Sequence, residues 1–151
     1  MALKIKKLHP EAIIPKYVRA GDAAMDLYAA EAKTLQPNTR ELVSTGIAMA
    51  IPEGFVGLIW DRSGMAANHG IKSMGGVIDA NFRGEIKVIL HNLSNQPLPI
   101  EKGMRIAQML IQKVEQKEIQ EVQELDETIR GDKGFGSSGL NILPAGTGAN
   151  N

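Results

Sequence analysis

The chain has 151 residues, the usual size of a single domain, which leaves room for one hydrophobic core. Its 17 Lys and Arg side chains balance 17 Asp and Glu side chains, so bulk charge favours neither a nucleic-acid backbone nor an anionic membrane as a partner. Cysteine is absent, which excludes a disulfide framework, thiolate zinc sites and a cysteine nucleophile. We expect any anionic ligand to be held by a local site.

The chain lacks the apolar windows that mark export or membrane insertion. No window approaches the ~20 apolar residues of a membrane span, and the N-terminus has no apolar stretch of signal-peptide length. We therefore expect a cytoplasmic protein that does not associate with a membrane.

Short apolar or alternating runs recur along the chain between turn residues. They cover residues 42–50, 55–60, 85–93 and 105–111, and each is bounded by Gly, Pro, Asn or Ser. This spacing predicts an all-β barrel or sandwich. Residues 63–68 favour one short helix that stops at Gly70, and residues 81–84 could close a hairpin between 76–78 and 86–88.

The C-terminal third is less regular. Residues 115–124 suit a helix about as well as an irregular strand, and we expect a strand there. From residue 128 the composition becomes rich in glycine and then uncharged, which is typical of a flexible arm. The sequence therefore predicts a β-domain over residues 1–127 and an arm over residues 128–151.

The arm contains Arg-Gly-Asp-Lys-Gly-Phe-Gly-Ser-Ser-Gly at residues 130–139. Closely spaced glycines let backbone N–H groups converge on an anion, and the serines add hydroxyl donors. The pattern is not a Walker A loop, and glycine content alone fits a plain flexible tail. Arg130 and the lone aromatic Phe135 favour a ligand-binding role, because an aromatic ring in a polar arm could stack on a base.

A second stretch, Arg62-Ser63-Gly64, ends an apolar run and opens the expected helix. A helix N-terminus with an arginine and a hydroxyl is a plausible oxyanion site, although Ser63 taken alone reads as a helix N-cap. Ser63 is a weaker candidate for a nucleophile, because none of the three histidines lies in a recognisable triad motif.

Three further stretches carry polar residues that could serve chemistry. Asp79 follows an apolar run, where a carboxylate could orient or deprotonate a water or simply form a turn. Asp22 and Asp26 bracket small residues and could hold hydrated Mg2+, although solvated surface acids are the commoner explanation. Gln108 interrupts an apolar strand, where it could reach a ligand or a neighbouring backbone group.

Taken together and in this order, the five stretches resemble the five signature motifs of the trimeric dUTP pyrophosphatase (dUTPase) family. The motifs read approximately Gly-Asp-Ala-Gly-x-Asp-Leu, Arg-Ser-Gly-x-Ala, Gly-Val-Ile-Asp-x-Asp-Tyr-Arg-Gly, Arg-x-Ala-Gln and Arg-Gly-x-Gly-Gly-Phe-Gly-Ser-Thr-Gly. The resemblance covers about residues 10–139.

The resemblance implies a mainly β fold, a jelly-roll-like antiparallel β-barrel with one short helix and a flexible C-terminal arm. It implies a homotrimer with active sites at subunit interfaces, over which the arm closes. The implied reaction is a dUTP diphosphatase reaction with Mg2+ as cofactor, in which water attacks the α-phosphorus of dUTP and yields dUMP and pyrophosphate. This would keep uracil out of DNA and supply dUMP for thymidylate synthesis, without direct nucleic-acid binding.

The resemblance also implies residue roles. Asp79 would activate the attacking water, Asp26 would bind Mg2+ through water, and Phe82 would press on the deoxyribose and exclude a 2′-hydroxyl. Gly76 would contribute to the backbone edge that reads uracil, and Phe135 would stack over the base. The implied substrate-binding residues are Arg62, Ser63, Gly64, Gly76, Phe82, Gln108, Arg130, Phe135, Gly136, Ser137 and Ser138.

Five positions depart from the family motifs. Phe82 replaces tyrosine and loses its hydroxyl, while Asn81 replaces aspartate, Ala24 and Lys133 replace glycine, and Ser138 replaces threonine. None of these changes removes a charge or hydroxyl that the implied mechanism requires.

Three alternatives remain open to test. A dCTP deaminase shares the implied fold and trimer, but that family lacks a closing arm of the Gly-Phe-Gly-Ser type. A non-catalytic binding trimer would have no need of Asp79, Asp26, Arg62 and Ser63 together. A purely structural β-protein leaves Phe135 in its polar arm without a purpose.

Overall fold

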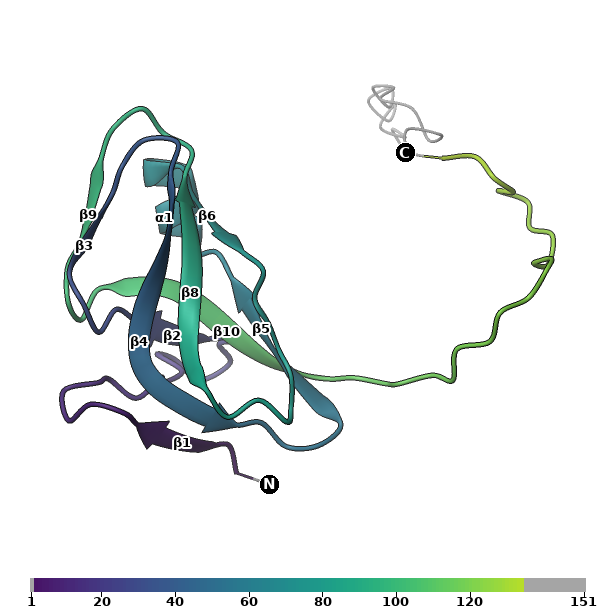
Figure 1. Cartoon of the computed structure of the whole chain (residues 1–151), viewed down its shortest axis with the longest axis horizontal. Helices are drawn as coiled ribbons and strands as arrows, with labels where there is room; N and C mark the ends of the chain where they lie inside the picture. Colours follow the sequence, from purple (N-terminus) through teal and green to yellow (C-terminus); the bar gives the residue numbers. More distant parts are fainter. Residues whose placement is uncertain (1, 135–151) are drawn as a thin grey trace, which may run out of the picture. The chain divides into compact units, whose positions relative to one another are not determined.

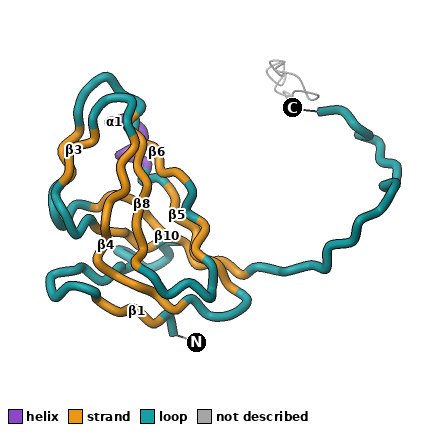
Figure 2. Tube along the Cα trace, viewed as in Figure 1, coloured by secondary structure: helices purple, strands orange, loops and turns teal. Residues whose placement is uncertain are grey.

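The computed structural model describes residues 2–134. The chain divides into a compact unit, Met1–Gln116, and a second unit, Lys117–Asn151. Strands and connecting loops make up nearly all of the described chain (Figure 2). The elements are β1 (Lys4–Lys7), β2 (Met25–Tyr28), β3 (Lys33–Leu35), β4 (Arg40–Ala50), β5 (Phe55–Trp60), α1 (Ser63–His69), β6 (Ile71–Met74), β7 (Val77–Ile78), β8 (Glu85–Asn92), β9 (Leu98–Ile100) and β10 (Arg105–Lys113).

The strands pair antiparallel in two four-stranded sheets and one two-stranded sheet. The first sheet has the order β1-β4-β8-β6, the second β2-β10-β5-β7, and β3 pairs with β9. Figure 1 shows β4 and β8 side by side, with β10 and β5 behind them. The mainly β fold with antiparallel sheets and one short helix, as predicted, is confirmed.

One hydrophobic core lies between the two larger sheets. Val43 of β4 and Ile86 of β8 come from the first sheet, and Leu27 of β2 and Met109 of β10 come from the second; each is fully buried. Alternate residues of β8 point into this core, as its burial pattern shows. Burial of these side chains supplies the main stabilisation, at about 25 cal/mol per Å2 of apolar surface.

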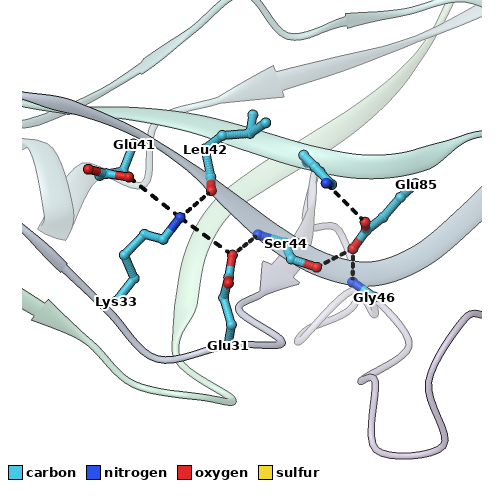
Figure 3. A network of polar contacts seen from close by, with 8 residues as sticks. Glu31, Lys33, Glu41, Leu42, Ser44, Gly46 and Glu85 are labelled. Carbon is cyan, nitrogen blue, oxygen red and sulfur yellow. Dashed lines mark hydrogen bonds and ion pairs between the residues drawn. The ribbon is translucent and has the colours of Figure 1, made fainter.

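A network of carboxylates holds β4 where its pairing with β8 is interrupted. Between Ser44 and Ala48 the register shifts, so that β4 bulges away from β8. A carboxylate oxygen of Glu85 accepts hydrogen bonds from the Ser44 hydroxyl and, at 2.9 Å, from the Gly46 N–H. Glu31 accepts from the Ser44 N–H at 2.8 Å (Figure 3), so the bulge leaves neither N–H group unpaired.

The expected hairpin between residues 76–78 and 86–88 is wrong. β7 pairs with β5, where Gly57 lies opposite Ile78, whereas β8 pairs with β4 and β6. The chain leaves the first sheet at Gly75 and Gly76, whose φ angles are +65° and +97°. Glycine adopts these conformations without a Cβ clash, so the chain changes sheets at a point that the strand pattern alone does not mark.

The expected strand over residues 115–124 is also wrong, because β10 ends at Lys113 and residues 114–134 contain neither helix nor strand. Within this segment Ile119 is 96% exposed and Leu125 is 85% exposed. The predicted boundary between residues 127 and 128 stays a prediction.

Among residues 2–134, no helix is long and apolar enough to cross a membrane.

Candidate functional site

A cavity of about 730 Å3 collects residues from three of the five stretches that the sequence singles out. Its walls come from the loop before β2, the end of β5, the start of α1 and the strand β10. The sequence-predicted residues on this cavity are Asp26, Arg62, Ser63, Gly64 and Gln108. Residues more than 80 positions apart, such as Asp26 and Gln108, therefore line one site, as the pairing of β2 with β10 requires.

Asp26 is the electrostatic centre of this cavity. Asp26 is only 8% exposed. One of its carboxylate oxygens pairs with Arg62 Nε at 3.0 Å, and the other pairs with a guanidinium nitrogen of Arg105 at 3.3 Å. A guanidinium carries five N–H donors, so each arginine keeps further donors for an anionic ligand while Asp26 holds it in place. Arg62 also donates to the Arg105 carbonyl at 3.5 Å.

The sequence analysis assigned no role to Arg105, because its place on the cavity depends on a β-bulge. In a regular strand, Arg105 and Gln108 would point to opposite faces of β10. The register of β10 against β2 shifts between Arg105 and Ala107, and Ile106 and Ala107 are both buried. The bulge brings Arg105 and Gln108 to the same cavity, and nothing in the sequence signals it.

Gln108 and Asp61 connect the cavity to the rest of the fold. The amide nitrogen of Gln108 donates to the Asp61 carbonyl at 2.6 Å, which satisfies a polar side chain in an apolar strand. The Asp61 carboxylate accepts from Ser73 and pairs with Lys72 Nζ at 2.8 Å. Burial raises the pKa of Asp61, but the hydrogen bonds from Lys72 and Ser73 outweigh it and leave the pKa below its usual value.

The interpretation of Ser63 as a helix N-cap is wrong. The N-cap position is Arg62, which has extended backbone angles, and Ser63 is the first residue of α1. No side-chain capping bond is made at this end of the helix, whereas Gly70 ends it in the left-handed conformation, as predicted. Ser63 thus lines the cavity without the capping role that the sequence suggested.

Asp79 and Phe82 lie in the turn that joins β7 to β8. Asp79 is exposed and lines a separate cavity of about 610 Å3. The Phe82 N–H donates to the Asp79 carbonyl at 3.1 Å, and Arg83 donates from one nitrogen to the carbonyls of Ala80 and Phe82 at 2.6 and 2.7 Å. The turn therefore carries Asp79 and the Phe82 ring as one hydrogen-bonded unit.

Two glycines give this region its shape. A Cβ on Gly84 would lie 2.6 Å from Phe82 Cζ, so the ring packs directly over the Gly84 backbone. A Cβ on Gly76 would lie 2.8 Å from the Ile59 carbonyl oxygen, and the Gly76 carbonyl accepts from the Ile59 N–H at 2.8 Å. Gly76 lines a third cavity of about 210 Å3. The sequence analysis assigned no role to Gly84, because only the position of the Phe82 ring shows that a side chain would not fit there.

The predicted site residues do not all meet within one chain. The cavities that contain Asp26 and Asp79 share no lining residue. Arg130 lies in the second unit, where its Nε donates to the Lys133 carbonyl at 3.3 Å. The predicted residues Phe135, Gly136, Ser137 and Ser138 lie outside the described residues.

The described part of the chain offers few protein ligands to a metal ion. Within residues 2–134 no three His, Cys, Asp or Glu side chains gather as a metal site. Asp22 and Asp26 line the same cavity, however, and Mg2+ is commonly bound by one or two carboxylates, with water and substrate phosphates as its other ligands. The donor set therefore fits Mg2+ in this mode and does not form a closed metal site.

The chain was compared with known protein families and with individual proteins. The family model described as dUTPase matches residues 10–139. A deoxyuridine 5'-triphosphate nucleotidohydrolase of Corynebacterium glutamicum is 50% identical, with 91% of this chain and 95% of that protein covered. One from Clostridium kluyveri is 45% identical, with 92% and 99% covered.

Solved structures give the same relationship. The dUTPase of Staphylococcus bacteriophage 80alpha with dUPNHPP has a TM-score of 0.86 and 31% identity, and the match covers 92% of this chain and 99% of that one. A variant of the dUTPase from phage phi11 of S. aureus, described as showing how a structural Mg(II) ion is coordinated, has a TM-score of 0.77, 25% identity, and 82% and 98% coverage. The chain therefore belongs to the dUTPase family.

Proposed function

We propose that the protein is a dUTP diphosphatase that hydrolyses dUTP to dUMP and pyrophosphate. The observation that carries this proposal is the convergence of Asp26, Arg62, Ser63 and Gln108 on one 730 Å3 cavity, in a chain that belongs to the dUTPase family. Several relatives of similar length are named deoxyuridine 5'-triphosphate nucleotidohydrolases. In a cytoplasmic location, the reaction would keep uracil out of DNA and supply dUMP for thymidylate synthesis.

The triphosphate would bind in the 730 Å3 cavity. Arg62 is held by Asp26 and keeps N–H donors free to pair with phosphate oxygens. Ser63, Gly64 and Gln108 line the same cavity, and a hydroxyl, a backbone N–H and an amide from them would add neutral donors. Fixed donors of this kind favour the transition state, because they need no reorganisation as charge develops on the departing pyrophosphate.

Asp79 would act as the general base. An exposed carboxylate on a hydrogen-bonded turn can accept the proton of a water as that water attacks the α-phosphorus. The Phe82 ring, packed over Gly84 on the same turn, would contact the deoxyribose and leave no volume for a 2′-hydroxyl. The uracil would lie against the backbone at Gly76.

Mg2+ would be held by Asp26 through water and by the substrate phosphates. When bound, Mg2+ neutralises negative charge on the phosphate oxygens. The Asp26 carboxylate would orient the hydration shell of the ion while it keeps Arg62 and Arg105 in place.

A homotrimer would bring the separated cavities together. One chain carries the Asp26 cavity and the Asp79 turn on different parts of its surface, so a second copy would have to supply the missing half of each site. The segment from Arg130 to Ser138, with the ring of Phe135, would close over the bound nucleotide and exclude bulk water.

The test is the Asp79→Asn variant, assayed for pyrophosphate release from dUTP. Loss of a general base typically costs about 10²–10⁴-fold in rate, so we expect kcat to fall by that amount while dUTP binding and the oligomer persist. Glu53→Gln is the matched control, because Glu53 lines the same 610 Å3 cavity but has no proposed role. Equal rates for Asp79→Asn and the parent protein, or an equal loss in both variants, would overturn the assignment.

A further inference from the structure

The junction between β5 and α1 carries Arg62 to the 730 Å3 cavity. The pairing of β5 with β10 ends at Trp60, which lies opposite Gln108. Asp61 therefore lies beyond the paired strand, and Arg62 is the N-cap of α1, with extended backbone angles and no side-chain capping bond. Since neither strand pairing nor a helix cap fixes this junction, other contacts have to hold it.

Asp61 joins the junction to both larger sheets. One of its carboxylate oxygens accepts from the N–H and from the hydroxyl of Ser73 in β6, each at 2.6 Å, and the other pairs with Lys72 Nζ at 2.8 Å. Its backbone carbonyl accepts from the amide nitrogen of Gln108 in β10, also at 2.6 Å. Because β6 belongs to the first sheet and β10 to the second, this one residue bridges the two sheets directly beside Arg62.

The contacts of the Asp61 side chain suit an ionised carboxylate. Burial raises the pKa of Asp61, but the hydrogen bonds from Lys72 and Ser73 outweigh it and hold the pKa below its usual value. The Ser73 N–H, the Ser73 hydroxyl and the Lys72 ammonium are all donors, and an ionised carboxylate only accepts. An asparagine has a single amide oxygen, so its NH2 group would have to face one of these donors.

Two groups of the proposed triphosphate site depend on Asp61. The Arg62 guanidinium is held by Asp26, whereas its main chain follows Asp61 directly. The Gln108 amide carries two N–H donors, of which one is directed at the Asp61 carbonyl and the other is left for a ligand. A displacement of about 1 Å in such a site can cost about 100-fold in rate, so the groups that hold the donors matter as much as the donors.

We propose that Asp61 is a positioning residue for the triphosphate, and that it holds the main chain before Arg62 and the amide of Gln108 in place. Asp61 needs no contact with the phosphates, because it acts through these two neighbours. This inference rests on the proposed hydrolysis of dUTP and adds a carboxylate that precedes the Arg62-Ser63-Gly64 stretch.

The test measures Kd by calorimetry, with Mg2+, for dUPNHPP, a triphosphate analogue, and for dUMP, which has one phosphate. We expect Asp61→Asn to weaken dUPNHPP binding by about 10- to 100-fold, the factor for loss of one charge-assisted hydrogen bond, and to leave dUMP binding unchanged. Glu31→Gln is the matched control. Glu31 also accepts a backbone N–H, at 2.8 Å, and pairs with a lysine, but it lines neither the 730 Å3 nor the 610 Å3 cavity, so both Kd values should stay unchanged.

A double-mutant cycle shows whether Asp61 acts through Arg62. If it does, Asp61→Asn should weaken dUPNHPP binding less in a chain that already carries Arg62→Ala than in the parent protein. Additive losses in the double variant would overturn the positioning role, because a residue that only stabilises the fold would act independently of Arg62.

The remaining outcomes separate this inference from the proposed function. A parent protein that releases no pyrophosphate from dUTP contradicts the proposed function itself. An active parent, with Asp61→Asn that binds dUPNHPP as tightly or loses dUMP binding to the same extent, overturns the role of Asp61 alone. If Asp61→Asn fails to fold, Ser73→Ala replaces it, because it removes only the hydroxyl donor. We then expect about 2- to 10-fold weaker dUPNHPP binding, and an unchanged Kd would overturn the inference.

Discussion

Replacing Gly76 by alanine tests how closely the chain must approach Ile59 at the 210 Å3 cavity. The residue has a φ of +97°, where a side chain is strained, and a Cβ would lie 2.8 Å from the Ile59 carbonyl oxygen and 3.0 Å from Ile59 Cβ. Strain of this kind costs about 1–3 kcal/mol, and loss of the hydrogen bond from the Ile59 N–H costs about 0.5–1.5 kcal/mol. We expect Gly76→Ala to lower the free energy of unfolding by about 2–4 kcal/mol.

Gly54→Ala is the matched control, because Gly54 also has a positive φ, +79°, but nothing lies within 4 Å of the position of an added Cβ. Only backbone strain should destabilise this variant, which lowers its free energy of unfolding by about 1–2 kcal/mol. Urea unfolding of both variants at equal protein concentration measures the difference, since stability of an oligomer depends on concentration. Equal stability of the two variants would contradict the expected clash between a Cβ at Gly76 and Ile59.

Two further predictions concern the ionised groups. Asp26→Asn removes the acceptor for Arg62 and Arg105, so we expect a loss of about 1–3 kcal/mol in urea unfolding at neutral pH, and an unchanged midpoint would show that the pairs contribute nothing. Although burial raises the pKa of Glu85, hydrogen bonds from Ser44 and Gly46 outweigh it and hold the pKa below 4.5, the ordinary value for a glutamate. Its stabilising contribution is therefore full above pH 4.5 and lost as the pH falls through the lowered pKa, so Glu85→Gln should be less stable than the parent at neutral pH and lose less stability below pH 4.5. Parallel pH profiles for the two proteins would contradict this.

The sequence predicted the elements whose signals are local. The alternating run from Phe55 to Trp60 and the helix that stops at Gly70 depend on neighbouring residues alone, and both are found within one residue of their expected ends. The motif stretches include Asp26, Arg62 and Gln108, which the structure places on one cavity, because the family resemblance carries long-range information that periodicity lacks.

Features that depend on contacts between distant segments were missed. The chain changes sheets at Gly76 because no Cβ obstructs its approach to Ile59, and the sequence shows a glycine there without its neighbour. Arg105 joins the cavity through a bulge that local propensity does not encode. Asp61 accepts hydrogen bonds from Ser73 of β6, which lies 12 residues further along the chain, so no motif links the two.

The central claim is tested most directly by measuring pyrophosphate release from dUTP, UTP, dTTP and dCTP, with Mg2+ and with a chelator, while ammonia from dCTP is followed in parallel. We expect release from dUTP alone and its loss when Mg2+ is chelated. Ammonia from dCTP would identify a deaminase, and release from none of the four nucleotides would contradict the proposed hydrolysis.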